Sequence, residues 1–149
     1  MTATAPRLAR VLGAAGLVPQ IMVLLVLLEH NSDLRFSALS MGYAYAALIL
    51  SFLGGLWWGL AAKADAAPGW IWAAAVAPSL VALASAVPWA TGEPWPGPSL
   101  YILGVALIAS LCVDWLLVRQ AIAPPWWMSL RVPLSVGLGG LTLLAAILD

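Results

Sequence analysis

Charge is scarce in this sequence of 149 residues: 8% of them are Asp, Glu, Lys or Arg, and the formal net charge is zero. An ordinary soluble domain carries about 25% charged residues. Six basic and six acidic side chains cannot coat a water-soluble globule of this length. The composition therefore excludes a soluble enzyme, a disordered tail and a protein that attracts nucleic acid by its net charge.

Residues that build metal and disulfide sites are also scarce. The one cysteine, Cys112, lies in an apolar run, which excludes a disulfide framework and a thiolate metal cluster. The one histidine, His30, follows Glu29 in a predicted loop and is expected to be solvated. The sequence also contains no phosphate-binding glycine loop, nucleophile elbow or HExxH motif. We therefore expect a protein that is not an enzyme and that holds no metal or cofactor.

Long apolar runs are what the sequence has instead. Apolar residues make up 64% of the chain, and the mean hydropathy is +1.02. Charges and turn formers divide the chain into five apolar segments, at about 11–28, 38–62, 70–90, 99–118 and 130–148. Each has about the 20 residues that cross a bilayer, where backbone groups must be paired within the segment. The prediction is an all-α protein, a single domain over 1–149 that forms a compact bundle of five transmembrane helices.

Basic residues predict the orientation of the bundle, because short cytoplasmic loops are enriched in Lys and Arg. One face collects five basic residues: Arg7, Arg10, Lys63, Arg119 and Arg131. The opposite face has Arg35 alone. We expect a multi-pass protein of the bacterial inner membrane, surrounded by lipid, with its N terminus cytoplasmic and its C terminus periplasmic.

Prolines interrupt three of the segments. Pro19 and Pro78 each lack an N–H and free a carbonyl one turn back, so kinks are expected that shape a cavity or are satisfied by neighbouring helices. Pro133 is expected in the first turn of the last helix, where proline is tolerated.

Tryptophan is abundant and unevenly placed. Seven of the nine tryptophans are expected near the cytoplasmic face: Trp57, Trp58, Trp70, Trp72, Trp115, Trp126 and Trp127. Only Trp89 and Trp95 are expected on the other side. One interpretation is an aromatic belt at the headgroup level. The other is an aromatic pocket for a flat lipophilic ligand, and the asymmetry favours a second role for this face.

Small residues recur every four positions in the second segment, at Ala47, Ser51, Gly55 and Gly59. Such a ridge allows close helix packing in lipid. We expect packing within the bundle, with a dimer seam as the alternative.

Asp114 is the one carboxylate inside a predicted span, about 7 Å from the boundary at Arg119. A charge at this depth is costly, so it should face the bundle and have a partner. Ala106, Ser110 and Asp114 share a helix face, and Arg131 is the expected partner, with Arg119 as the alternative. Asp114 is then either half of an ion pair that holds two helices together or a carboxylate that binds a proton or ligand.

Several motifs resemble one membrane family. The stretch SFLGGLWWG at 51–59 is the most specific, with GLVP at 16–19, APSL at 77–80, Asp114 and PWWMSLR at 125–131. Together they resemble the family named domain of unknown function 3429, which includes transmembrane protein 69-like proteins. One departure is Trp57, where that family often carries His or Arg. The resemblance implies the fold and topology above and no particular activity.

The sequence favours a non-enzymatic accessory or assembly subunit of a larger membrane complex, because the loops are short and the interior holds few polar groups. The alternative is a binder or carrier of a quinone, carotenoid, sterol or porphyrin in a Trp-rich pocket near the cytoplasmic leaflet. An intramembrane enzyme acting through Asp114 is disfavoured, because no second catalytic group is visible. The candidate ligand-binding residues are Trp57, Trp58, Trp70, Trp115, Trp126, Asp114 and Arg131.

Overall fold

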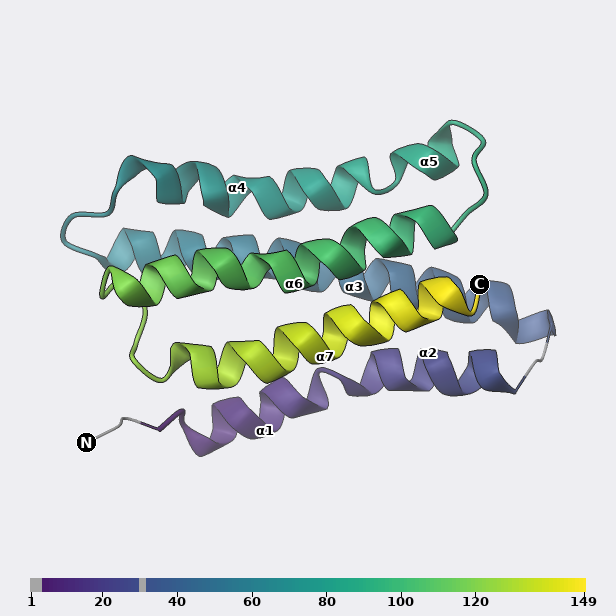
Figure 1. Cartoon of the computed structure of the whole chain (residues 1–149), viewed down its shortest axis with the longest axis horizontal. Coiled ribbons are helices and arrows are strands. Elements are labelled where there is room, and N and C mark those ends of the chain that lie inside the picture. The colour runs from purple at the N-terminus through teal and green to yellow at the C-terminus, as the bar shows by residue number, and fades with distance from the viewer. Residues whose placement is uncertain (1–3, 30–31) are drawn as a thin grey trace.

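The computed structural model describes residues 4–29 and 32–149, and the only regular elements in these ranges are helices (Figure 1). His30, for which a solvated position was predicted, lies outside the described residues. The helices are α1 (Arg7–Ala15), α2 (Val18–Leu28), α3 (Ser32–Lys63), α4 (Gly69–Ala84), α5 (Val87–Ala90), α6 (Gly97–Arg119) and α7 (Trp127–Ile147). α1 with α2, and α4 with α5, each form one broken span.

Five spans are long and apolar enough to cross a membrane, which confirms the predicted architecture. They are Arg7–Leu28, Ser32–Lys63, Gly69–Ala90, Gly97–Arg119 and Trp127–Ile147. α3 lies at the centre and packs against α2, α4, α6 and α7, and α6 and α7 pack against each other most extensively. The two termini lie at opposite ends of the bundle (Figure 1).

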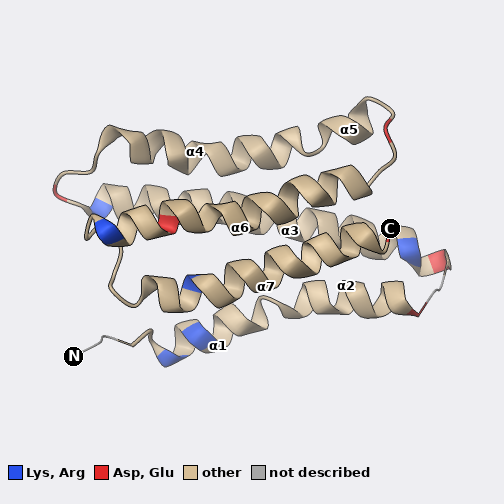
Figure 2. Cartoon of the chain, viewed as in Figure 1, with Lys and Arg blue, Asp and Glu red and all other residues tan. Residues whose placement is uncertain are grey.

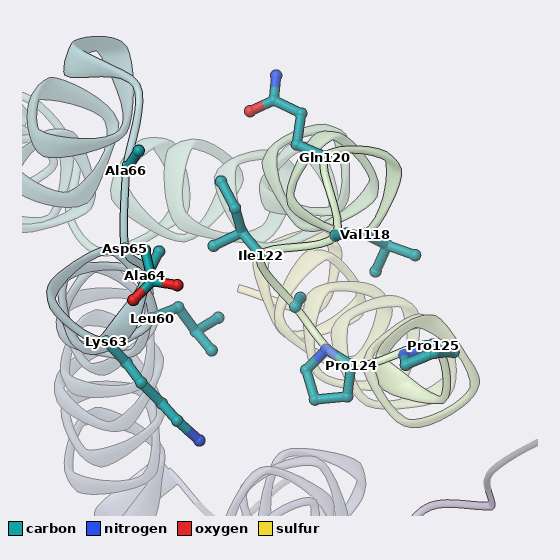
Figure 3. Close-up of a pocket in the computed structure, with 12 residues that line it drawn as sticks. Leu60, Lys63, Ala64, Asp65, Ala66, Val118, Gln120, Ile122, Pro124 and Pro125 are labelled. Carbon is teal, nitrogen blue, oxygen red and sulfur yellow. The ribbon is translucent and has the colours of Figure 1, made fainter.

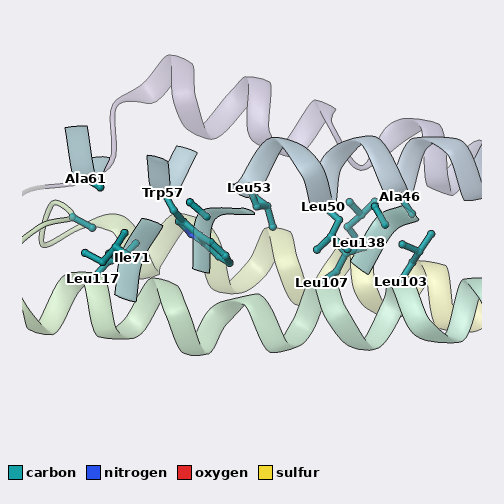
Figure 4. Packing of buried hydrophobic residues seen from close by; sticks show 13 residues of the cluster. Ala46, Leu50, Leu53, Trp57, Ala61, Ile71, Leu103, Leu107, Leu117 and Leu138 are labelled. Atoms are coloured by element: carbon teal, nitrogen blue, oxygen red, sulfur yellow. The ribbon is translucent and has the colours of Figure 1, made fainter. Parts of the chain in front are cut away.

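The core is a row of aliphatic side chains between these helices. Leu50, Leu53, Leu103 and Leu107 are at most 2% exposed, and they line the contact between α3 and α6 (Figure 4). Many large apolar side chains point outward instead: Leu83 is 72% exposed. Apolar side chains thus lie both on the exterior and in the core. A protein surrounded by lipid is expected to have this distribution, because lipid solvates apolar side chains.

The first span is broken at Gly16 and Leu17, and α2 begins at Val18 with Pro19 in its first turn. The Tyr45 hydroxyl of α3 donates a hydrogen bond of 2.6 Å to the Gly16 carbonyl oxygen. A carbonyl freed by the break thus has a partner from a neighbouring helix, as intramembrane irregularities require. Pro78, in contrast, is accommodated inside the continuous helix α4.

The last helix begins at Trp127, three residues before the predicted Leu130. Pro133 therefore lies in the second turn of α7, and the prediction that it occupies the first turn is wrong. The early start places Trp127 and Arg131 on one face of α7, because residues four positions apart lie above each other on a helix.

The closest helix contacts are made by glycines other than those predicted. A Cβ on Gly54 would lie 2.2 Å from the Ala75 carbonyl oxygen of α4, and a Cβ on Gly104 would lie 3.1 Å from the Gly139 oxygen of α7. The predicted ridge along Ala47, Ser51, Gly55 and Gly59 was expected to pack within the bundle, which is wrong for its glycines. A Cβ on Gly55 or Gly59 would meet nothing within 4 Å, because both glycines face outward.

Most of the charged residues lie near the two ends of the bundle, and one red and one blue segment lie further inside, on α6 and α7 (Figure 2). The half of the bundle that holds the N terminus carries five basic and two acidic residues: Arg7, Arg10, Lys63, Arg119, Arg131, Asp65 and Asp114. The end with the C terminus carries one basic and four acidic residues: Arg35, Glu29, Asp33, Glu93 and Asp149. Five of the six basic residues thus lie in the half of the bundle that holds the N terminus.

Candidate functional site

Asp114 is the centre of a polar network inside the bundle. Its side chain is 0% exposed. Arg131 of α7 donates from Nε to Oδ2 at 2.9 Å. Trp57 of α3 and Trp127 of α7 both donate their indole N–H to Oδ1, at 2.9 Å and 2.8 Å. Three donors from two helices therefore hold one carboxylate of α6, as a buried charge requires.

Two serines extend the network around Arg131. The Nη2 atom donates to Ser135 Oγ at 2.7 Å and to Ser110 Oγ at 3.5 Å. Ser110 in turn donates to the Leu107 carbonyl oxygen at 2.6 Å. We call Asp114, Arg131, Trp57, Trp127, Ser110 and Ser135 the Asp114 network.

Helical spacing brings these residues together. Trp127, Arg131 and Ser135 follow one another at intervals of four on α7, and Ser110 and Asp114 have the same spacing on α6. Residues at this interval share a helix face. The two polar faces meet where α6 and α7 pack, so the network ties α3, α6 and α7 together.

An apolar cavity of about 410 Å³ lies beside the network, and we call it the α1 cavity. Its walls come mainly from α1, α3 and α7, with Leu107 from α6 and with the break between α1 and α2. The residues that line it are Ala9, Leu12, Gly13, Gly16, Leu17, Tyr45, Ile49, Phe52, Leu53, Leu56, Leu107, Trp126, Trp127, Leu130, Arg131, Leu134, Ser135 and Leu138. Its volume falls in the range of about 300–1,000 Å³ that small-molecule pockets occupy.

The α1 cavity lies in the half of the bundle that holds the N terminus. Along α7 it reaches from Trp126 to Leu138, which is about 18 Å at 1.5 Å per residue. On the first span it reaches from Ala9 to Leu17, where the helix is broken. Arg131 is the one charged residue among those that line it.

Three of the predicted site residues come together. Trp57, Asp114 and Arg131 are joined in the Asp114 network, and the expected ion pair between Asp114 and Arg131 is present. Arg131 also lines the α1 cavity, as does Trp126. Asp114 does not line it, because its carboxylate is enclosed by its three donors.

The other predicted ligand-binding residues lie elsewhere. Trp58 is 49% exposed and contacts Trp72 edge to face, with ring centroids 4.8 Å apart. Trp70 packs against the aliphatic core. Trp115 is exposed, and the Arg119 guanidinium lies 4.7 Å from its ring centroid, so Arg119 is not the partner of Asp114. The tryptophans therefore do not form one Trp-rich pocket.

Sequence reasoning missed Trp127, Ser135 and Tyr45 as site residues. The interval of four from Trp127 through Arg131 to Ser135 was a usable signal, because it marks one face of the last helix. Nothing in the sequence indicated Tyr45, since its place beside the α1 cavity depends on how α1 and α3 pack.

A second polar contact lies deeper in the bundle. Gln20 of α2 and Thr142 of α7 are both 0% exposed, and Gln20 Nε2 donates to Thr142 Oγ1 at 3.2 Å. Gln20 Oε1 has no hydrogen-bond partner in the described part of the chain. The nitrogen of the buried Gln20 amide is therefore hydrogen-bonded, and its oxygen has no described partner.

A wider hollow of about 630 Å³ lies at the end of the bundle, between the loop after α3 and the loop after α6 (Figure 3). Lys63, Asp65 and Gln120 line it with apolar and proline residues. In the described ranges no three His, Cys, Asp or Glu side chains group to hold a metal ion. No hydrogen bond between side chains defines this hollow, so it offers less than the α1 cavity to a specific ligand.

Comparison with known proteins gives a family and no function. A family described as "Protein of unknown function (DUF3429)" matches residues 5–148. No curated protein and no solved structure matches the chain.

Proposed function

Because the chain belongs to the DUF3429 family, whose description assigns no activity, we propose from the geometry that it is a non-enzymatic membrane protein that binds a flat lipophilic molecule in the α1 cavity. The observation that carries the proposal is an apolar cavity of about 410 Å³ with a single charged side chain, Arg131, in its wall. Mostly apolar linings with a few placed polar groups are typical of small-molecule sites.

The lining suits a ligand with a ring system. The rings of Trp126 and Trp127 lie 5.9 Å apart at an angle of 45°, and both residues line the cavity. Aromatic rings give a large apolar contact area and pack well against other flat groups. A quinone, sterol, carotenoid or porphyrin has such a shape.

We propose no enzymatic activity because of the way Asp114 is held. Both of its oxygens accept hydrogen bonds from Trp57, Trp127 or Arg131, so the carboxylate is not free to act as a base. A general base must reach the proton that it removes. Asp114 also does not line the cavity in which a substrate would lie.

The proposed location is a bacterial inner membrane, with the α1 cavity in the cytoplasmic leaflet. Five of six basic residues share the end that holds this cavity, and cytoplasmic loops are enriched in basic residues. A ligand would then enter from the inner leaflet.

Purification in a mild detergent tests the proposal. Native mass spectrometry, with absorbance and mass analysis of a solvent extract, should find one lipophile per chain. Gly13→Leu should remove at least 90% of it, because Gly13 lines the cavity and a Cβ there already lies 2.8 Å from Leu134 Cδ1. Gly55→Leu is the matched control, because a Cβ on Gly55 meets nothing within 4 Å. A wild-type protein that retains no lipophile, even after incubation with quinone, sterol, carotenoid and porphyrin, would contradict the proposal.

A second candidate is an accessory or assembly subunit of a membrane complex. It is favoured by the outward position of Gly55 and Gly59, which leave a smooth strip of α3 open to another helix. Small residues at a lipid-facing surface permit close helix approach. Crosslinking in native membranes should trap a partner that the double variant Gly55→Leu, Gly59→Leu loses and that Leu83→Trp on α4 keeps. A protein that is monomeric and free of partners in native membranes would exclude this role.

A further inference from the structure

Arg131 has hydrogen-bonding capacity that the protein leaves unused. A guanidinium carries five N–H groups. Nε donates to Asp114, and Nη2 donates to Ser135 and Ser110. No described residue accepts a hydrogen bond from Nη1. Since Arg131 lines the α1 cavity, the two N–H groups of Nη1 can donate to a molecule inside it.

The charge of Arg131, in contrast, is already compensated. Asp114 lies 2.9 Å away and is fully buried, so the two residues form a neutral pair. No second charged side chain lines the cavity in the part of the chain that the structure describes. An anionic ligand would therefore bring one uncompensated negative charge into an apolar site, which is costly.

Two other polar side chains of the cavity already donate to the protein. The Tyr45 hydroxyl donates to the Gly16 carbonyl, and the Trp127 indole donates to Asp114. Ser135 accepts from Arg131. The Ser135 hydroxyl hydrogen and the Trp126 indole N–H have no acceptor among the described residues. A ligand thus meets donors at Arg131, Ser135 and Trp126 and apolar contacts almost everywhere else.

We infer that the ligand of the α1 cavity is a neutral lipophile with a carbonyl oxygen, such as a quinone, and that this oxygen accepts hydrogen bonds from Arg131 Nη1. The inference rests on the proposed function and narrows it. A carbonyl has no net charge to desolvate, and it offers the Nη1 donors an acceptor that no described residue supplies. Carotenes lack an acceptor, and porphyrins with carboxylate side chains and fatty acids carry the charge that the cavity does not balance.

Three probes of equal chain length separate these classes: a decyl quinone, decanoate and decylbenzene. Binding of each to the detergent-solubilised full chain is measured by native mass spectrometry. The quinone should bind one per chain, at least tenfold more tightly than the other two. Gly13→Leu should abolish its binding. Arg131→Lys, which keeps the positive charge beside Asp114 and removes the guanidinium, should lower quinone affinity at least tenfold.

Infrared spectroscopy of the wild-type protein keeps the test independent of whether Arg131→Lys folds. With a ¹³C-labelled quinone carbonyl, the C=O stretch should move to lower wavenumber on binding, because hydrogen bonding weakens that bond. An unshifted band, equal affinity for the quinone and decylbenzene, or tighter binding of decanoate would overturn the inference while leaving the proposed function standing. If none of the three probes binds and no lipophile copurifies, the proposed function fails as well.

Discussion

Trp57 and Trp127 donate their indole N–H groups to the same oxygen atom, Oδ1 of Asp114, from two different helices. The other oxygen accepts from Arg131. A single carboxylate therefore fixes how α3, α6 and α7 pack, and its removal should loosen all three contacts. The first two predictions follow from this arrangement.

Removing only the acid should be far more harmful than removing the whole ion pair. Asp114→Ala leaves the Arg131 guanidinium buried without its counter-ion, which costs about 3–5 kcal/mol of stability. The double variant Asp114→Ala, Arg131→Met replaces both charges by apolar groups and should recover most of that loss. Thermal unfolding in one detergent measures both. A double variant as unstable as Asp114→Ala would show that the ion pair is not the source of the effect.

Adjacent tryptophans should respond differently to the same substitution. Trp57→Phe removes a donor to a buried carboxylate and leaves space in the core, so a loss of about 1–3 kcal/mol is expected. Trp58→Phe should change stability by less than about 0.5 kcal/mol, because Trp58 is 49% exposed and donates to no described residue. Equal effects of the two changes on the unfolding temperature would contradict the proposed role of the Trp57 hydrogen bond.

Two neighbouring glycines on α3 provide a test of the helix packing. Gly54→Ala should force α3 and α4 apart, because the new Cβ would lie 2.2 Å from the Ala75 carbonyl oxygen. Gly55→Ala should be neutral or stabilising by up to about 1 kcal/mol, since alanine favours a helix and nothing lies within 4 Å. Unfolding temperature and monodispersity in detergent report both. A larger loss of stability from Gly55→Ala than from Gly54→Ala would show that Gly55, and not Gly54, faces α4.

Gln20 and Thr142 should behave as a coupled pair. Thr142→Val removes the one partner that the Gln20 amide has among the described residues, and it should cost about 1–3 kcal/mol, since both amide ends are then unpaired. Gln20→Leu with Thr142→Val removes the polar groups together and should be close to wild type. A double-mutant cycle of unfolding free energies gives their coupling. Additive losses would show that the two side chains do not interact.

The orientation of the bundle is open to direct labelling. In a Cys112→Ser background, Asp65→Cys should react with an impermeant thiol reagent only from the cytoplasmic side, and Glu93→Cys only from the periplasmic side. The expectation rests on the five basic residues at the end that holds Asp65. The reverse labelling pattern in intact cells and inverted vesicles would show that the topology is inverted.

The spans could be predicted because they depend on composition alone. Long apolar runs between charges and prolines form helices in lipid, since a helix pairs its backbone groups within the segment. The partner of Asp114 was also predictable, since a buried charge needs a counter-ion at the same depth and few charges are present. These inferences need no knowledge of which helices are neighbours.

The packing face of α3 and the cavity could not be predicted, because both depend on which helices are neighbours. On α3, Gly54 and Gly55 point about 100° apart. The four-residue spacing of small side chains follows Gly55, whereas Leu50 and Trp58 lie four residues from Gly54, so the sequence favours the wrong face. Only the position of α4 decides that Gly54 is the contact. The α1 cavity likewise depends on the break at Gly16 and on the distance between α1 and α3, which are properties of tertiary packing.

The helix α1 forms one wall of the cavity, yet none of its residues is buried, and it packs mainly against α7. Segments of a protein open separately, with free energies from near zero up to that of global unfolding, and those with few buried contacts open first. Backbone amides at 7–15 should therefore exchange hydrogen for deuterium before those of α6 and α7. The lifetime of anything held in the cavity is then set by this local opening, while the rest of the bundle stays closed.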